Sequence, residues 1–173
     1  YSGDPDPSLV LKDLGDEYQV TRTGVKPHAC CRYNQGPIDC LLDVKQNHDF
    51  QPMDVEEVKI GMLSGGMGLV AQPEEAKRNP TSVVDMQFSM PFAAAVALTY
   101  GKASLDEYAL GVPDRPEVRH IMDRVQCVTD PELDALYPRH FPTWAEVRTK
   151  DGRTMRSELT YPKGDPENPV TWD

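Results

Sequence analysis

Residues 25–42, VKPHACCRYNQGPIDCLL, hold an unusual set of side chains that could do chemistry. Lys26 and His28 could act as general acid or base, because a desolvated lysine has a lowered pKa and histidine titrates near neutral pH. Arg32 adds a second fixed cation, so the stretch could also bind an anion. The structural alternative is a solvated Lys26 and a His28 that fills a half-buried gap. Cys31 could be a nucleophile, although a small buried thiol is the commoner role of cysteine.

A helix is expected to follow this cluster and to hold it in place. Gly36-Pro37 marks the expected start, because proline is tolerated in a first turn where its missing N–H has no helical partner. The residues at helical spacing after it are Ile38, Leu41, Leu42 and Lys45. The partial positive charge of a helix start would add to Arg32 and Lys26, which suits a carboxylate or phosphate ligand.

A second polar group comes directly before the most apolar segment of the chain. Residues 93–98 are small and hydrophobic on all sides, which indicates a buried helix rather than a surface helix. Pro91 fits the first turn of this helix and Gly101 its C-terminal cap. Gln87 and Ser89 stand at its entrance, where backbone N–H groups are free to bind a ligand.

The bulk composition limits the partners. The 173 residues suffice for one domain with a real core, and the net charge of −10 argues against nucleic acid and against an anionic membrane surface. A local group of Lys and Arg can still bind an anionic small molecule. No run reaches the roughly 18 apolar residues of a membrane-spanning helix, and no signal peptide is visible. We therefore expect no nucleic-acid partner and no membrane partner.

The four cysteines lie at positions 30, 31, 40 and 127, without a CxxC pair or the spacing of a metal site. Adjacent cysteines such as Cys30 and Cys31 rarely pair with each other, so we expect reduced thiols and a cytoplasmic protein. The histidines at positions 48, 120 and 140 are scattered, without HxH or HExxH spacing. The sequence therefore predicts no metal site.

The remaining patterns indicate a mixed order of helices and strands. Further helices are expected at residues 9–14 and 104–110 and after a cap at Asp114; strands are expected at 18–25, 55–62, 126–128, 143–149 and 154–161. The glycine cluster at 64–68 indicates a flexible connection, since no GK[ST] of a phosphate-binding loop follows it. Residues 73–80 indicate a solvated turn. We expect an α+β, two-layer domain whose mainly antiparallel sheet is covered by helices on one face.

Three motifs resemble those of one family. KPHACCRY followed by PID is similar to the K-x-Y-x-x-C-R signature of the MmgE/PrpD family. NPTSVVDMQFSMPFAAAVALTYG resembles the entrance to that family's buried alanine-rich helix, and DGRTMRSELTYPKGDPENP resembles the hairpin and GDP-x-NP exit near its C-terminus. The motifs span nearly the whole chain in the family's order.

The resemblance implies that residues 1–173 form the smaller C-terminal α+β lid domain. It also implies that the family's all-helical N-terminal domain is absent from this chain and is its natural partner, within a homodimer. The chain starts at Tyr1 without a methionine and stops at Asp173, where the sequence indicates the start of a new element. We therefore expect a piece of a longer protein.

The resemblance further implies site residues. Lys26 and Cys31 are expected to face the active-site cleft, and with His28 they are the expected catalytic residues. Some relatives place histidine at the Cys31 position, where it transfers protons. The expected substrate-binding residues are Arg32, Ser89 and Gln87. Some relatives carry tyrosine at the position of Phe92. The phenylalanine of this chain has no hydroxyl and cannot donate a hydrogen bond there.

The implied activity is a cofactor-independent lyase, a hydro-lyase acting on a 2-methylcitrate-like di- or tricarboxylate. The alternatives are a cis-aconitate decarboxylase, an epimerase similar to iminodisuccinate epimerase, or a fragment that serves only in folding or dimerisation. All three reactions can pass through a carbanion or enolate beside a carboxylate, so all need cations around the substrate and a base at one C–H. None demands a metal or another cofactor.

Overall fold

A four-stranded sheet forms one layer of the domain in the computed structural model, which describes residues 6–171. The strands are β1 (Val55–Met62), β2 (Val125–Thr129), β3 (Thr143–Thr149) and β4 (Thr154–Leu159), in the spatial order β2-β1-β3-β4. β1 runs parallel to β2 and antiparallel to β3, and β3 pairs antiparallel with β4. The predicted α+β class with a mainly antiparallel sheet is therefore confirmed.

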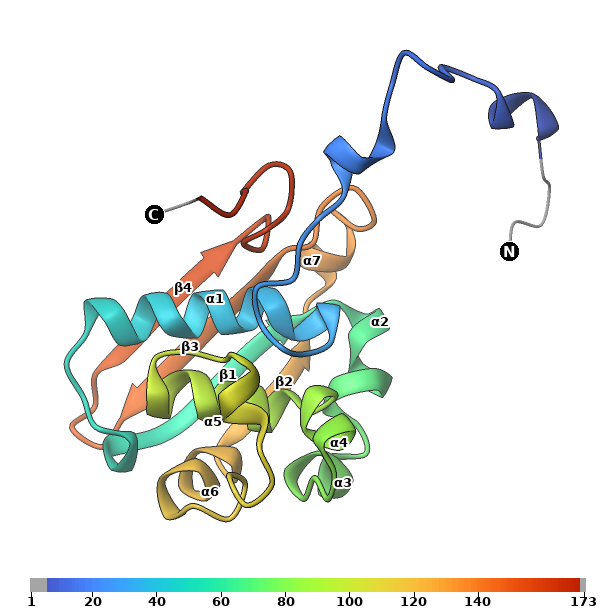
Figure 1. The fold of residues 1–173 in the computed structure, drawn as a ribbon. Helices are drawn as coiled ribbons and strands as arrows, with labels where there is room; N and C mark the ends of the chain where they lie inside the picture. Colours follow the sequence, from blue (N-terminus) through green and yellow to red (C-terminus); the bar gives the residue numbers. More distant parts are fainter. Residues whose placement is uncertain (1–5, 172–173) are drawn as a thin grey trace.

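One face of this sheet is buried because apolar residues alternate along its strands. In β3 the side chains of Ala145 and Val147 are buried, whereas Glu146 between them is partly exposed. Helices α1 (Arg32–Asn47) and α5 (Met90–Tyr100) lie over the buried face, as Figure 1 shows. The core of the domain is the space between these helices and the sheet.

The predicted buried helix is confirmed as α5. Residues 90–98 are all buried, so this helix has no solvent-facing side over most of its length. The Ser89 hydroxyl caps the first turn by accepting a hydrogen bond from the backbone N–H of Phe92 at 3.1 Å. Pro91 lies in the first turn, and Gly101 ends the helix with a left-handed φ of 67°.

Helix α1 begins earlier than predicted. It starts at Arg32, and Pro37 lies inside the helix rather than in its first turn, so the expected start at Gly36-Pro37 is wrong. The glycine serves close packing instead of a turn, because a Cβ atom at Gly36 would lie 2.8 Å from Cγ2 of Thr143 in β3. Pro37 has no N–H to donate to the carbonyl of Tyr33, four residues earlier, yet the helix continues through it.

The N-terminal segment lacks the predicted strand. Residues 18–25 contain a 3₁₀ helix (η2, Gln19–Arg22), and the helix expected at 9–14 is a short 3₁₀ helix at Pro7–Val10 (η1). Tyr18 and Val20 alternate with polar residues but are 65% and 76% exposed, because this segment extends away from the sheet (Figure 1). Alternation predicts a strand only where a neighbouring strand can pair with it.

Two expected connections are helical. Ser64–Gly66 forms a helical turn (α2) that continues into a π-helix at Met67–Ala71 (η4), so the expected flexible connection is wrong. Gly66 allows close packing on α1, since a Cβ atom there would lie 2.5 Å from Cδ1 of Tyr33. The expected turn at 73–80 contains helix α3 (Glu74–Arg78), whose acidic first turn and basic last turn complement the helix dipole.

The other helical segments are η3 (Pro52–Asp54), α4 (Val83–Gln87), η5 (Leu105–Tyr108), α6 (Pro116–Met122) and α7 (Pro131–Asp134). The capping box of Ser104 and Glu107 is present at the start of η5, as its spacing predicts. The cap expected at Asp114 lies one residue later, at Arg115. Among residues 6–171, no helix is both long and apolar enough to cross a membrane.

Candidate functional site

The loop of residues 25–31, which carries Lys26, is attached to three other parts of the chain. The backbone contacts, with the donor first, are Val25 N to Gly164 O (2.8 Å), Ala29 N to Ala103 O (3.2 Å) and Cys31 N to Gln87 O (2.9 Å). Their partners belong to the C-terminal loop, the segment after α5 and the end of α4. The backbone of Lys26 therefore lies between fixed points, while its side chain is exposed.

Two side chains of α1 hold the middle of the same loop. Gln35 is fully buried, and its Oε1 accepts from the backbone N–H of His28 at 3.1 Å. Its Nε2 donates to the carbonyls of His28 at 3.0 Å and of Cys30 at 3.2 Å. One turn later, Oδ1 of Asp39 lies 2.9 Å from Nε2 of His28, and its Oδ2 accepts from the backbone N–H of Lys163 at 2.7 Å.

Four of the six predicted site residues line one small hollow of about 260 Å³: Lys26, His28, Cys31 and Gln87. The remaining walls are Ala29, Cys30 and Phe88. The hollow therefore has a primary amine, an imidazole, a thiol and an amide around it. These groups can bind a carboxylate and exchange protons with a small molecule.

The two adjacent cysteines have different environments. Cys30 is 5% exposed, and burial raises the pKa of its thiol to about 12, so it stays protonated at neutral pH. Cys31 is half-buried and forms part of the hollow's wall, which makes it the thiol that a ligand could reach. All four cysteines are free thiols.

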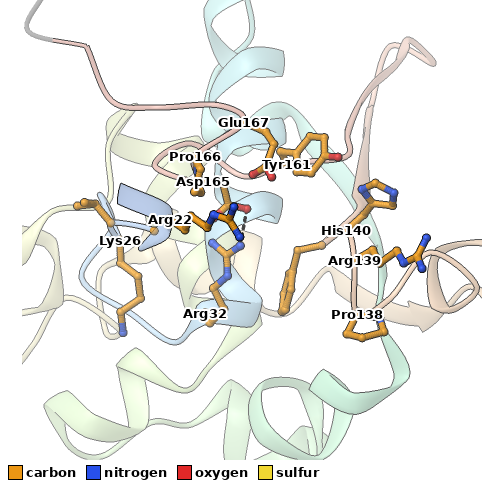
Figure 2. Close-up of a pocket in the computed structure, with 13 residues that line it drawn as sticks. Arg22, Lys26, Arg32, Pro138, Arg139, His140, Tyr161, Asp165, Pro166 and Glu167 are labelled. Atoms are coloured by element: carbon orange, nitrogen blue, oxygen red, sulfur yellow. Dashed lines mark hydrogen bonds and ion pairs between the residues drawn. The ribbon is translucent and has the colours of Figure 1, made fainter. Parts of the chain in front are cut away.

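A larger hollow of about 860 Å³ shares Lys26 with the small one (Figure 2). Its charged lining residues are the cations Arg22, Lys26, Arg32 and Arg139 and the carboxylates Asp165 and Glu167. Cations outnumber carboxylates here, although the whole chain carries a net charge of −10. Figure 2 also shows that the Arg139 side chain extends away from Arg32, so these two arginines do not converge on one small anion.

Arg32 is engaged by the protein itself. Its Nη2 donates to Oδ2 of Asp165 at 2.6 Å, and its guanidinium lies 4.6 Å from the ring centre of Phe141. The predicted substrate ligand thus joins the first signature motif to the GDP motif near the C-terminus. The guanidinium donors that Asp165 does not use remain available to a ligand in the larger hollow, which Arg32 lines.

Ser89 lies away from both hollows. It is fully buried, its Oγ donates to the carbonyl of Lys77 at 2.5 Å, and the same oxygen accepts from Phe92. In the structure this hydroxyl therefore caps helix α5 and does not line either hollow. Gln87, two residues earlier, reaches the small hollow because α4 ends there.

Sequence reasoning missed the residues that hold the loop, above all Gln35 and Asp39. Asp165 is the aspartate of the GDP motif near the C-terminus, and this motif could have marked it as a partner for Arg32. Arg22, Arg139 and His140 of the larger hollow carried no local signal. Within residues 6–171, no group of three or more His, Cys, Asp or Glu side chains is placed to hold a metal ion.

Fold and site together describe a two-layer α+β domain that presents a lysine, an imidazole and a thiol at one hollow. Residues 28–173 match the family model of the MmgE/PrpD C-terminal domain, so the chain belongs to the MmgE/PrpD family. It is also 29% identical, over 175 residues, to a cis-aconitate decarboxylase-like protein (oryM) of Aspergillus oryzae strain ATCC 42149 / RIB 40. That alignment covers 96% of this chain and 35% of the relative, so the chain spans about a third of the relative's length.

Proposed function

We propose that this domain supplies part of the active site of a cofactor-independent lyase that acts on a di- or tricarboxylate. The observation that supports this most is the small hollow, where Lys26, His28, Cys31 and Gln87 come together from two distant segments. A small carboxylic acid fits a site with one exposed cation and several hydrogen-bonding groups. Membership in the MmgE/PrpD family favours this class of reaction.

In this proposal Lys26 binds a substrate carboxylate and stabilises the negative charge that develops when a neighbouring C–H or C–C bond breaks. Asp39 orients the imidazole of His28 through the 2.9 Å contact, which selects the ring nitrogen that carries the proton. Cys31 and Gln87 also line the hollow, where a thiol and an amide can donate hydrogen bonds to the substrate. Arg32 contributes indirectly, through its ion pair with Asp165.

The proposed site is incomplete without the helical domain that the family resemblance implies. The small hollow lies at the surface of the domain, and a lyase site needs its water excluded and a base placed on the reacting carbon. We propose that the helical domain closes over the loop and supplies that base, and that the complete protein is a homodimer.

Two reactions remain as candidates within the proposal. The first is dehydration of a 2-methylcitrate-like acid. The second is decarboxylation of a cis-aconitate-like acid, which the printed name of the Aspergillus oryzae relative favours. Both place negative charge beside a carboxylate, so the same lysine can serve both.

The test uses the full-length protein with 2-methylcitrate and cis-aconitate as separate substrates. Lys26→Ala should lower turnover about 100-fold or more, because general acid–base and charge-stabilising groups contribute that much. The matched control is Lys150→Ala, at an exposed position in the β3–β4 turn, which should leave turnover unchanged. Unaltered turnover in Lys26→Ala would contradict the proposed role. A full-length protein that consumes neither acid would favour the non-catalytic module instead.

A further inference from the structure

Gln35 has no catalytic or binding role in the proposal above, yet it is among the most constrained polar side chains of the described residues. It is fully buried on the first turns of α1. Both ends of its amide bind the loop: the oxygen accepts from His28 N, and the nitrogen donates to the carbonyls of His28 and Cys30. The same nitrogen lies 3.3 Å from the Cys30 sulfur.

The paired contacts with His28 resemble one rung of a β-ladder, in which a residue both donates to and accepts from one partner. A side chain that does this replaces a neighbouring strand for an otherwise irregular loop. It fixes the direction of the His28 peptide groups as well as their position. Lys26, two residues before His28, and Cys31, three residues after it, both have roles in the proposed chemistry.

The other contacts of the loop cannot replace this one. The backbone contacts at Val25, Ala29 and Cys31 each use a single hydrogen bond, and Asp39 holds only the imidazole of His28. Without the Gln35 amide, the His28 N–H and the Cys30 carbonyl would lose their side-chain partner, and the His28 carbonyl would keep only the backbone N–H of Cys30 at 2.8 Å. Because unsatisfied polar groups are unfavourable, the loop would then turn toward water.

We propose that Gln35 is a positioning residue, which sets the orientation of Lys26 and Cys31 toward the small hollow by binding both sides of the His28 backbone. This inference rests on the proposed lyase function for its effect on turnover, but its effect on the loop is independent of that function. A misplacement of a reacting group by about 1 Å can lower turnover on the order of 100-fold. Turnover should therefore depend on a side chain that never touches substrate.

The first measurement is the rate of Cys31 alkylation by iodoacetamide in the 173-residue chain, read at Cys31 by peptide mass spectrometry. Gln35→Met keeps the side-chain length and removes all of these hydrogen bonds. Its Cys31 should react at least about 10-fold faster than in the parent sequence, since loosened loops open more often. The matched control is Gln46→Met on the same helix, where the glutamine is exposed and the rate should not change.

The second measurement is kcat and KM in the full-length protein. Gln35→Met should lower kcat about 10- to 100-fold while KM changes less, because misplacement affects the reacting geometry more than binding. If Gln35→Met fails to fold, Gln35→Glu replaces it, since this carboxylate keeps the volume and the acceptor for His28 N but loses both donations.

The outcomes separate the two proposals. Unchanged alkylation and unchanged kcat per folded molecule in these variants would overturn the positioning role. A loss of activity that only follows the unfolded fraction would also overturn it. Faster Cys31 alkylation, in a full-length protein that turns over neither acid before any substitution, would support the positioning of the loop and reject the lyase function.

Discussion

Gly164 supports the Lys26 loop in a way that can be measured. Its φ is +94°, and a Cβ atom there would fall well inside the van der Waals radius of the Val25 carbonyl oxygen. Gly152, in the β3–β4 turn, has a similar φ of +87° but nothing within 4 Å of such a Cβ. Alanine at the two positions therefore meets the same backbone strain, and a steric collision at only one of them.

The expected losses follow from these contacts. Alanine in a left-handed conformation costs about 1–2 kcal/mol, and the reduced entropy of the unfolded chain offsets part of that at both sites. Gly152→Ala should therefore lose about 1 kcal/mol of unfolding free energy. Gly164→Ala must also move the Val25 carbonyl and break the 2.8 Å hydrogen bond from Val25 N, which adds on the order of 2 kcal/mol. The expected loss is about 3 kcal/mol.

The assay is urea unfolding followed by circular dichroism, together with hydrogen exchange at the Val25 amide. Gly164→Ala should show the larger loss of stability and much faster exchange at Val25, whereas Gly152→Ala should leave that amide protected. In the full-length protein, Gly164→Ala should also lower turnover, because it displaces the residue next to Lys26. Equal losses of stability in the two variants, with Val25 still protected in both, would refute the reasoning.

Three further predictions concern charge and thiols. Asp165→Asn should lower the unfolding free energy by about 1–2 kcal/mol in urea titrations, because it leaves the guanidinium of Arg32 half-buried without its carboxylate; an unchanged midpoint would show that this ion pair contributes nothing. In the folded chain at pH 8, iodoacetamide should modify Cys31 well before Cys30, whose pKa is raised to about 12 by burial; equal rates in the folded chain would contradict this. Hydrogen bonds from Thr149 and Arg153 lower the pKa of Asp151 to about 2, so its contribution to stability is present above about pH 4 and is lost as the pH falls toward 2. The stability difference between the parent and Asp151→Asn should therefore shrink over that interval, and a constant difference would count against it.

The parts of the fold that were predictable depend on local patterns. The buried helix α5 has its cap, its proline and its terminal glycine within 13 consecutive residues, and the hairpin has Asp151-Gly152 between alternating strands. The strand at 55–62 was also predicted with its observed bounds. In these elements the residues that determine the structure are neighbours in the sequence, so their pattern can be recognised without knowing the fold.

The failures come from contacts between distant segments. Gly36 and Gly66 looked like turn and loop signals, but both are glycine because another element packs closely against them. Tyr18 and Val20 alternate like a strand, but the described part of the chain offers them no pairing strand. Residue type alone does not show which other element a side chain or a backbone will meet.

The candidate site divides in the same way. Lys26, His28, Cys31 and Gln87 were predicted by residue type and family resemblance, and they do line one hollow. Arg32 was predicted as a substrate ligand from its charge, whereas its partner Asp165 lies 133 residues further along the chain. Gln35 was not predicted at all, because a glutamine inside a helix pattern has no signal until the loop beside it is known.

The attachments of the Lys26 loop also set the order in which the domain can be completed during synthesis. Asp39 and Lys163, which meet through a 2.7 Å hydrogen bond, are 124 residues apart, and Arg32 and Asp165 are separated by 133. At about 5–20 residues per second, the ribosome needs on the order of ten seconds to make the second partner after the first. A nascent chain therefore carries Lys26 and Cys31 on a loop that lacks its contacts with the C-terminal segment until the GDP motif has emerged. In chains that stop before Gly164, the loop of residues 25–31 would never gain these contacts.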